Sequence, residues 1–261
     1  MTGGPAPRDA ATVLLLRDAA RGLEVFMVKR NAMVDFMAGA HVFPGGKVDA
    51  ADAEPALLER LRGARDPAVA PELYVAAVRE TFEEAGVLLG AGADAAALAR
   101  SGLLRGAAFV EQAASLEVGF DADRLVLWTR WVTPLASPKR FDARFFLAAA
   151  PPDQEASHDE GETTASGWFA PGEALELAAR GEMLVAPATF KCLAVLAQHG
   201  NVDAAFAAAR AQTARTWCPV IRNEAGRRLV ILSDDPEHPD RYARMPGPTR
   251  MAFEGGRFVP V

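Results

Sequence analysis

Three glutamates in the segment 76–87 have the spacing and the chemistry of a cation site. If the segment is helical, Glu80, Glu83 and Glu84 fall within an arc of roughly 100°, because each residue of an α-helix is rotated by about 100° from the last. Like charges three and four positions apart destabilise a helix by roughly 0.2–0.5 kcal/mol per pair, so a bound cation is the natural reason for this arrangement. Carboxylate oxygens are hard ligands, and the pattern therefore indicates Mg²⁺ or Mn²⁺.

The side of this predicted helix opposite the glutamates is apolar. Its residues recur at three- and four-residue intervals, as in a helix buried against a core, and they are Val75, Val78, Phe82 and Ala85. Arg79 lies four residues before Glu83, within reach of an ion pair, and we expect it to hold that carboxylate in one orientation. Gly86 stands where such a helix would end. An acidic face that is simply exposed to water is the alternative interpretation.

A glycine-rich turn precedes the predicted helix. The strand-like run 41–43 is followed by Pro44, Gly45 and Gly46, and glycines let a backbone approach a ligand closely. Gly46 together with the run 79–87 resembles the Nudix box, G-x5-E-x7-R-E-U-x-E-E-x-G-U, in which U is apolar. The second half of the box matches except at Thr81, where the box has an apolar residue.

The first half of the box is altered. Six residues after Gly46 stands Asp52 where the box has glutamate, and Arg79 comes 19 residues later than in an uninterrupted box. We therefore interpret residues 53–71 as an insertion before the helix. Similar insertions mark the branch of the superfamily that includes the peroxisomal coenzyme A diphosphatases, and residues 36–46 also resemble that branch.

The resemblance implies an α/β protein, a Nudix-type α/β/α sandwich with a mixed sheet, helical insertions and a C-terminal extension. We expect a single domain over residues 1–261, with its core at about 10–181. Insertions are expected at about 53–71 and 92–118, and the extension at about 182–261.

Local patterns predict the elements that must position the box. We predict strands at 12–17, 24–30, 41–43, 125–133 and 142–149, and helices at 53–62, 94–99, 107–115, 172–180, 187–199 and 203–212. The C-terminal part is predicted to form a hairpin of 217–222 with 228–232. The Pro- and Gly-rich stretch 236–261 is predicted to wrap the surface.

The resemblance also implies roles for individual residues. The implied catalytic residues are Arg79, Glu80, Glu83, Glu84 and Glu162. The three box glutamates and the carbonyl oxygen of Gly46 are the implied metal ligands. Nudix proteins often carry a further metal ligand or base several residues before a tryptophan such as Trp168. Glu162 is the first choice for it and Glu160 the second, whereas His158 is interpreted as a loop histidine.

Candidate substrate contacts lie outside the helix. They are Arg30, Phe43, Gly45, Gly46, Lys139, Arg140 and Arg144. Arg30, Gly39 and the run 43–46 fit a motif of the coenzyme A-hydrolysing members, while Asp35 replaces the second arginine of that motif. Exchanging a phosphate-binding cation for an anion weakens the coenzyme A assignment without affecting the hydrolase assignment.

These residues predict a metal-dependent hydrolase that cleaves the phosphoanhydride bond of a nucleoside diphosphate linked to another group. Coenzyme A or an acyl-coenzyme A is the leading substrate class, and a box glutamate or Glu162 would be the base. The two alternatives are a binding module that keeps the fold without turnover, and an unrelated α/β protein whose acidic helix is solvated.

Bulk properties limit the partners. A net charge of −6 argues against binding to nucleic acid, and no apolar run approaches the roughly 20 residues of a membrane span. Cys192 and Cys218 are too few for a disulfide framework or a zinc cluster, so we expect thiols in a reducing compartment and a cytoplasmic protein, with a pairing between them left open. The expected partner is a small-molecule diphosphate, and the family resemblance leaves a homodimer open.

Overall fold

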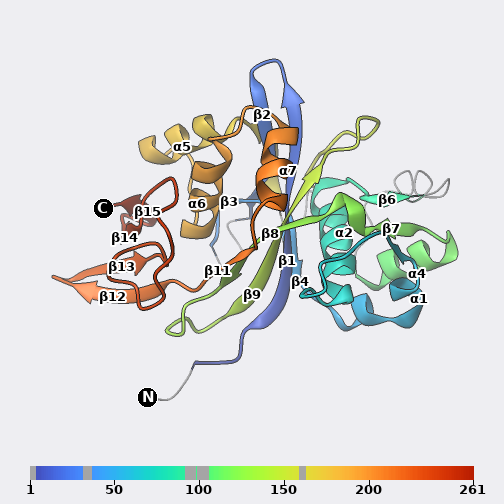
Figure 1. Ribbon diagram of the computed structural model, residues 1–261, viewed down its shortest axis with the longest axis horizontal. Coiled ribbons are helices and arrows are strands. Elements are labelled where there is room, and N and C mark those ends of the chain that lie inside the picture. Colours follow the sequence, from blue (N-terminus) through green and yellow to red (C-terminus); the bar gives the residue numbers. More distant parts are fainter. Residues whose placement is uncertain (1–3, 32–36, 92–97, 99–105, 159–162) are drawn as a thin grey trace.

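A mixed β-sheet forms the framework of the computed structural model, which describes residues 4–31, 37–91, 98, 106–158 and 163–261. Six strands follow the order β10-β2-β1-β9-β8-β11, and β3 and β4 pair with β2 and β1 (Figure 1). These strands are β1 Arg8–Ala19, β2 Gly22–Arg30, β3 His41–Val42, β4 Gly45–Lys47, β8 Val126–Val132, β9 Phe141–Ala149, β10 Thr163–Phe169 and β11 Arg215–Trp217. The strands predicted from local patterns are thereby confirmed, with shifted ends.

Alternation along β1 divides the core into two layers. Val13 and Leu15 pack with the helix α2, Pro71–Ala85, whereas Leu14 and Leu16 pack on the opposite face. The helices α5 Pro171–Arg180, α6 Pro187–Leu196 and α7 Val202–Arg210 cover that opposite face (Figure 1). The predicted α/β/α sandwich with a mixed sheet is therefore confirmed.

Helix α2 carries the acidic pattern. Pro71 occupies its first turn, where a missing N–H costs nothing, and it ends at Gly86 with a left-handed φ of 67°. The predicted apolar stripe is buried, since Val75, Val78 and Phe82 are at most 1% exposed. The helix and its predicted end at glycine are confirmed.

Short elements from the parts of the chain predicted as insertions, and from the residues next to them, form a small subdomain beside α2 (Figure 1). Its elements are η1 Ala50–Ala53, α1 Pro55–Leu58, β5 Leu61–Arg62, β6 Gly90–Ala91, α4 Ala107–Ser115, β7 Gly119–Asp121 and η2 Ala122–Arg124. The helix predicted at 107–115 is confirmed, but the one predicted at 53–62 is wrong. Only α1 is α-helical there, because Leu61 leaves the helix to pair with Phe120 in a three-stranded sheet. The helix predicted at 94–99 lies outside the described residues except for Leu98.

The C-terminal part forms a second, four-stranded sheet of β12 Val220–Glu224, β13 Arg227–Ile231, β14 Arg250–Glu254 and β15 Arg257–Pro260. The predicted late hairpin is confirmed as β12–β13, but Trp217 belongs to the main sheet, where its ring stacks on Trp131 at 5.2 Å. The prediction that 236–261 only wraps the surface is wrong. Met251 of β14 is fully buried, so burial of apolar side chains accounts for a strand in this Pro- and Gly-rich stretch.

Neither cysteine is paired. Cys192 is buried and Cys218 is half-buried, and both are free thiols, so the pairing that the sequence left open does not form. Within the described ranges, no helix combines the length and the apolar character needed to cross a bilayer.

Candidate active site

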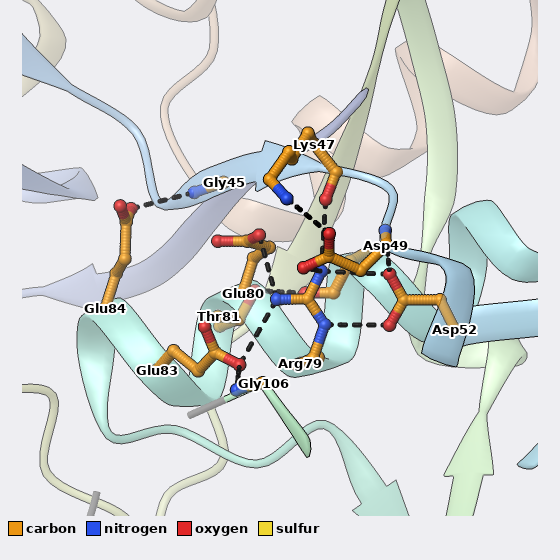
Figure 2. Close-up of polar contacts among 11 residues, drawn as sticks. Gly45, Lys47, Asp49, Asp52, Arg79, Glu80, Thr81, Glu83, Glu84 and Gly106 are labelled. Carbon is orange, nitrogen blue, oxygen red and sulfur yellow. Dashed lines mark hydrogen bonds and ion pairs between the residues drawn. The ribbon is translucent and has the colours of Figure 1, made fainter. Parts of the chain in front are cut away.

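The acidic face of α2 lies against the glycine turn. Glu84 Oε2 accepts a hydrogen bond of 2.9 Å from the backbone N–H of Gly45 (Figure 2). The Glu80 carboxylate lies so close to Gly46 that a Cβ on this residue would meet Glu80 Oε1 at 2.4 Å. Glycine is therefore required at position 46, because any side chain would displace the carboxylate.

Gly45 is constrained from the opposite side. A Cβ there would lie 2.4 Å from the carbonyl oxygen of Ala11 and 2.7 Å from Cα of Thr12. Both residues belong to β1, with which β4 pairs. The two glycines thus bring the chain into contact with a strand on one side and with a carboxylate on the other.

Arg79 connects the acidic helix with the inserted loop. Its Nε and Nη2 donate to Asp52 Oδ1 and Oδ2 at 2.7 and 2.9 Å, a bidentate geometry. Its Nη1 donates to Glu80 Oε1 at 2.9 Å and to Glu83 Oε1 at 3.2 Å (Figure 2). The predicted contact with Glu83 is confirmed. Asp52, the residue at which the sequence departs from the Nudix box, is itself fully buried in this contact.

The loop between β4 and η1 closes around the guanidinium of Arg79. The carbonyl oxygen of Lys47 accepts from Arg79 Nη2 at 3.1 Å, and the backbone N–H of Asp49 donates to Asp52 Oδ2 at 2.8 Å. Lys47 in turn pairs with the Asp49 carboxylate near the surface. Arg79 is consequently only 2% exposed.

Gly106 is a contact that sequence reasoning missed. Its backbone N–H, at the start of α4, donates to Glu83 Oε1 at 2.8 Å (Figure 2). The two residues are 23 positions apart, and nothing in the sequence around Gly106 indicates that its N–H binds Glu83. Glu83 therefore receives donors from both its own helix and the second insertion.

The glutamates are buried rather than solvated. Glu80, Glu83 and Glu84 are 9%, 8% and 4% exposed, so the alternative of an acidic face exposed to water is wrong. Burial raises the pKa of Glu80 to about 7; Arg79 opposes this rise, and the charge of Glu83 adds to it. Burial alone would lower the pKa of Arg79, but its bonds to Asp52 and the charges of the glutamates raise it. The site holds more negative charge than one guanidinium neutralises.

The residues present suit a hard divalent cation by their chemistry. Among the residues that the structure describes, three buried carboxylates, Asp52, Glu80 and Glu83, contact one buried arginine, and a fourth, Glu84, accepts from the Gly45 N–H. Carboxylate oxygens are the ligands that Mg²⁺ and Mn²⁺ take. In the described part of the chain, however, no three His, Cys, Asp or Glu side chains converge as a ready metal site. The glutamates instead point to Arg79 and to backbone N–H groups. Their role as metal ligands, with the Gly46 carbonyl, stays a prediction.

Several predicted site residues lie elsewhere. Glu160 and Glu162 are outside the described residues. Arg30 ends β2 and is paired with Thr163 of β10. Phe43 is 2% exposed and packs in the core on the face opposite α2, which corrects its prediction as a substrate contact through its side chain.

The three basic residues near the start of β9 are held in other contacts. Arg140 is buried and donates to the carbonyl oxygens of Thr133 and Pro5 at 3.0 and 2.9 Å, so its guanidinium anchors backbone instead of lining an open site. Arg144 pairs with Asp9 at 2.7 Å and with Asp142 at 2.9 Å. Lys139 is exposed in the turn before β9. Among the described contacts, none joins these side chains to the glutamates of α2.

Comparisons with known proteins agree with this architecture. Residues 64–196 match the family described as the NUDT19 Nudix domain. The chain is 29% identical to acyl-coenzyme A diphosphatase NUDT19 of Gallus gallus, over 89% of this chain and 81% of that protein. It is 28% identical to the Homo sapiens protein of the same name, over 83% and 72% of the two chains.

A solved structure of a Nudix hydrolase has a similar fold. The crystal structure of a Nudix hydrolase from Alicyclobacillus acidocaldarius superimposes with a TM-score of 0.67 at 30% identity, over 77% of this chain and 96% of that one. With the sandwich and the charged cluster around Arg79, these matches show that the chain belongs to the Nudix hydrolase family.

Proposed function

We propose that this Nudix hydrolase cleaves the phosphoanhydride bond of coenzyme A or an acyl-coenzyme A, with Mg²⁺ or Mn²⁺ as its cofactor. The observation that carries the proposal is the group of four buried carboxylates at the glycine turn, three of which share Arg79. Nudix hydrolases generally use a divalent metal ion, and this surplus of negative charge suits one. The relatives named acyl-coenzyme A diphosphatase support the substrate class.

The mechanism follows from a charge problem. A diphosphate is anionic and repels the water or hydroxide that must attack it, so its hydrolysis requires positive charge near its oxygens and a base near the water. Glu80, Glu83, Glu84 and the Gly46 carbonyl oxygen would hold the divalent ion. When bound, that ion would neutralise charge on the diphosphate and favour ionisation of the attacking water.

The chain's own residues hold these ligands in place. Asp52 fixes Arg79 through two hydrogen bonds, and Arg79 with the Gly106 N–H fixes Glu83. The Gly45 N–H fixes Glu84. Such support matters because catalytic groups must be held close to their productive geometry. The proton of the attacking water would pass to a glutamate of α2 or to Glu162.

The alternative of a binding module without turnover loses its main argument. It drew on Asp52 in place of glutamate and on the interrupted box. In the fold, Asp52 pairs with Arg79 in spite of the inserted segment, so the interruption has not removed the arginine's partner.

A product screen tests the proposal. The purified protein is incubated with Mg²⁺ and with free coenzyme A, an acyl-coenzyme A, ADP-ribose, a dinucleotide and a diadenosine polyphosphate, and products are identified by mass spectrometry. We expect 3′,5′-ADP with phosphopantetheine or its acyl form, and a rate of product formation about 10²–10⁴-fold lower from a Glu83→Gln variant. A nucleoside monophosphate without the 3′-phosphate, from another compound only, would overturn the coenzyme A assignment. No product from any compound would favour the binding module.

The proposal also includes a cytoplasmic location and a homodimer. The two free thiols support a reducing compartment. Light scattering on the purified protein would give its molecular mass in solution, and the mass of a single chain would exclude the dimer.

A further inference from the structure

A groove lies between the two inserted segments, beside α2. Its volume is about 360 Å³, within the range of small-molecule sites. One wall comes from η1 and α1 and the other from α4, which lie together on the α2 side of the main sheet (Figure 1). The groove is therefore built mainly by the predicted insertions, with Ala51 of the Nudix box at its edge.

The lining of the groove is apolar and lacks positive charge. Leu57 is fully buried at its floor, and Ala51, Val110 and Ala114 are only partly covered. Glu54 and Glu111 are exposed at its rim, and none of the described lining residues is a lysine or an arginine. Two carboxylates repel phosphate, while partly covered apolar side chains gain by burial against a neutral chain.

Both walls of the groove are joined to the catalytic cluster. Ala51 directly precedes Asp52, which binds Arg79. On the other wall, α4 begins at Gly106, which binds Glu83, and its Phe109 packs against Phe82 of α2 with ring centroids 5.5 Å apart. The walls of the groove and the groups that hold the glutamates therefore belong to the same two segments of the chain.

We propose that this groove receives the apolar acyl chain of the substrate and so gives the enzyme a preference for acyl-coenzyme A over free coenzyme A. The proposal rests on the coenzyme A assignment above and adds to it a specificity site made by the insertions. The glutamates at the rim disfavour the anionic diphosphate and 3′-phosphate, and the apolar lining favours the acyl chain over the neutral pantetheine arm, whose amide groups would lose hydrogen bonds to water there.

The test measures kcat/KM of the full chain with Mg²⁺ for free coenzyme A and for its butanoyl, octanoyl and dodecanoyl thioesters. In the wild type we expect kcat/KM to rise by roughly two- to fourfold per methylene until the groove is filled. Two variants alter the groove, Ala114→Phe by filling it and Val110→Asp by adding a charge. Both should lower the ratio of kcat/KM for dodecanoyl-coenzyme A to that for free coenzyme A by at least about tenfold.

Ala108→Phe is the matched control. It adds the same ring to an exposed position of the same helix, outside the groove, and should leave the wild-type ratio in place. The groove proposal is overturned if the wild type cleaves free coenzyme A without a chain-length preference. It is equally overturned if both groove variants, shown to be folded by their circular dichroism, keep the wild-type ratio. If the wild type cleaves no coenzyme A compound but does cleave another diphosphate, the substrate assignment fails and the groove proposal fails with it.

Discussion

Two bidentate Arg–Asp pairs with nearly the same geometry lie in different parts of the molecule. In the box cluster, defined as Arg79 with Asp52, Glu80, Glu83 and Glu84, the pair Arg79–Asp52 has contacts of 2.7 and 2.9 Å. In the C-terminal cluster, defined as Arg250, Asp235, Lys191 and Asp234, the pair Arg250–Asp235 has the same two distances. The pairs differ in their surroundings.

The C-terminal cluster gives each buried carboxylate a cation of its own. Lys191 Nζ donates to Asp234 at 2.6 Å and also lies near the carbonyl oxygens of Met245 and Pro248, at 3.4 and 3.3 Å. Asp235 is paired with Arg250. This arrangement ties β14 and the loop before it to α6, and its charges are balanced.

Among the described residues, the box cluster instead has three buried carboxylates in contact with one buried cation, and the fourth, Glu84, is bound to a backbone N–H. Burial of a carboxylate without its own partner is costly, so this cluster is held in a less stable state than balanced charges would give. Balanced buried charges thus serve structure, and the unbalanced ones lie where we propose that a divalent ion binds.

The largest predicted difference is in activity. Glu83→Gln or Glu84→Gln should lower kcat by about 10²–10⁴-fold and leave the metal-free stability unchanged or higher, because each removes a surplus charge. Asp234→Asn should leave kcat within about threefold and lower the free energy of unfolding. Steady-state kinetics and urea unfolding measure both quantities, and Glu176→Gln on the exposed side of α5 is the control. Equal losses of activity in the two clusters would contradict the comparison.

The two clusters should also differ in whether a second substitution restores the stability that is lost when the buried cation is removed. Arg79→Met and Lys191→Met should each cost about 3–5 kcal/mol, because each leaves a buried carboxylate unpaired. Adding Asp234→Leu to Lys191→Met should restore most of the lost unfolding free energy, since an apolar pair can replace a balanced ion pair. Adding Asp52→Leu to Arg79→Met should not, because Glu80 and Glu83 remain. Chemical denaturation of the four variants measures this, and equal rescue in both clusters would show that the box carries no surplus charge.

The two clusters should contribute to the pH dependence of stability in different pH ranges. The folded-state pKa of Glu80, about 7, lies above its ordinary 4.5, so its contribution to the free energy of unfolding is complete below pH 4.5 and is lost as pH rises through 7. Burial alone would raise the pKa of Asp235, but Arg250 lowers it to about 2, so its contribution is complete above pH 3.8 and is lost only as pH falls through 2.

Between pH 5 and pH 8 the contribution of Glu80 to the unfolding free energy should therefore fall by about 2–3 kcal/mol. Burial lowers the pKa of His41 to about 4, which changes stability in the opposite direction, so the contribution of Glu80 is read as the difference between the wild type and Glu80→Gln. Mg²⁺ should restore the lost unfolding free energy at pH 8, because we expect it to bind the ionised carboxylates. Glu80→Gln should remove this contribution and leave the rise in stability with pH that His41 causes. Denaturant unfolding at several pH values measures it, and an unchanged slope in Glu80→Gln would assign the effect to another group.

The smallest predicted difference concerns packing around the two aspartates. Asp52→Glu, which restores the residue of the Nudix box, should cost about 1–3 kcal/mol, since Asp52 is fully buried and one more methylene has no space. Asp235→Glu should cost less, because Arg250 is partly exposed and can move with the longer side chain. Thermal unfolding of the two variants measures the difference. If Asp52→Glu is stabilising instead, the loop that carries residue 52 can move to accommodate the extra methylene.

Local sequence was enough to predict α2, its end at Gly86 and the hairpin of β1 and β2, because apolar periodicity and glycine act over a few residues. It failed at 53–62 and 236–261, where partners distant in the chain decide the structure. Leu61 becomes a strand residue because Phe120 lies beside it, and Met251 becomes one because β13 does. Phe43 stands next to the glycine turn in sequence, yet its side chain is directed to the opposite core layer.

The sequence by itself determined which groups the site contains: the carboxylates of α2, Arg79 beside them and the glycines that admit them, since residue type and helical spacing are local properties. Only the tertiary structure decided how those groups are held. Asp52 reaches Arg79 across 27 positions and Gly106 reaches Glu83 across 23, and the burial that shifts the pKa of Glu80 comes from the packing of the whole site. Contacts between distant residues depend on the path of the chain in space, and the local sequence around either residue does not show which distant residue it will contact.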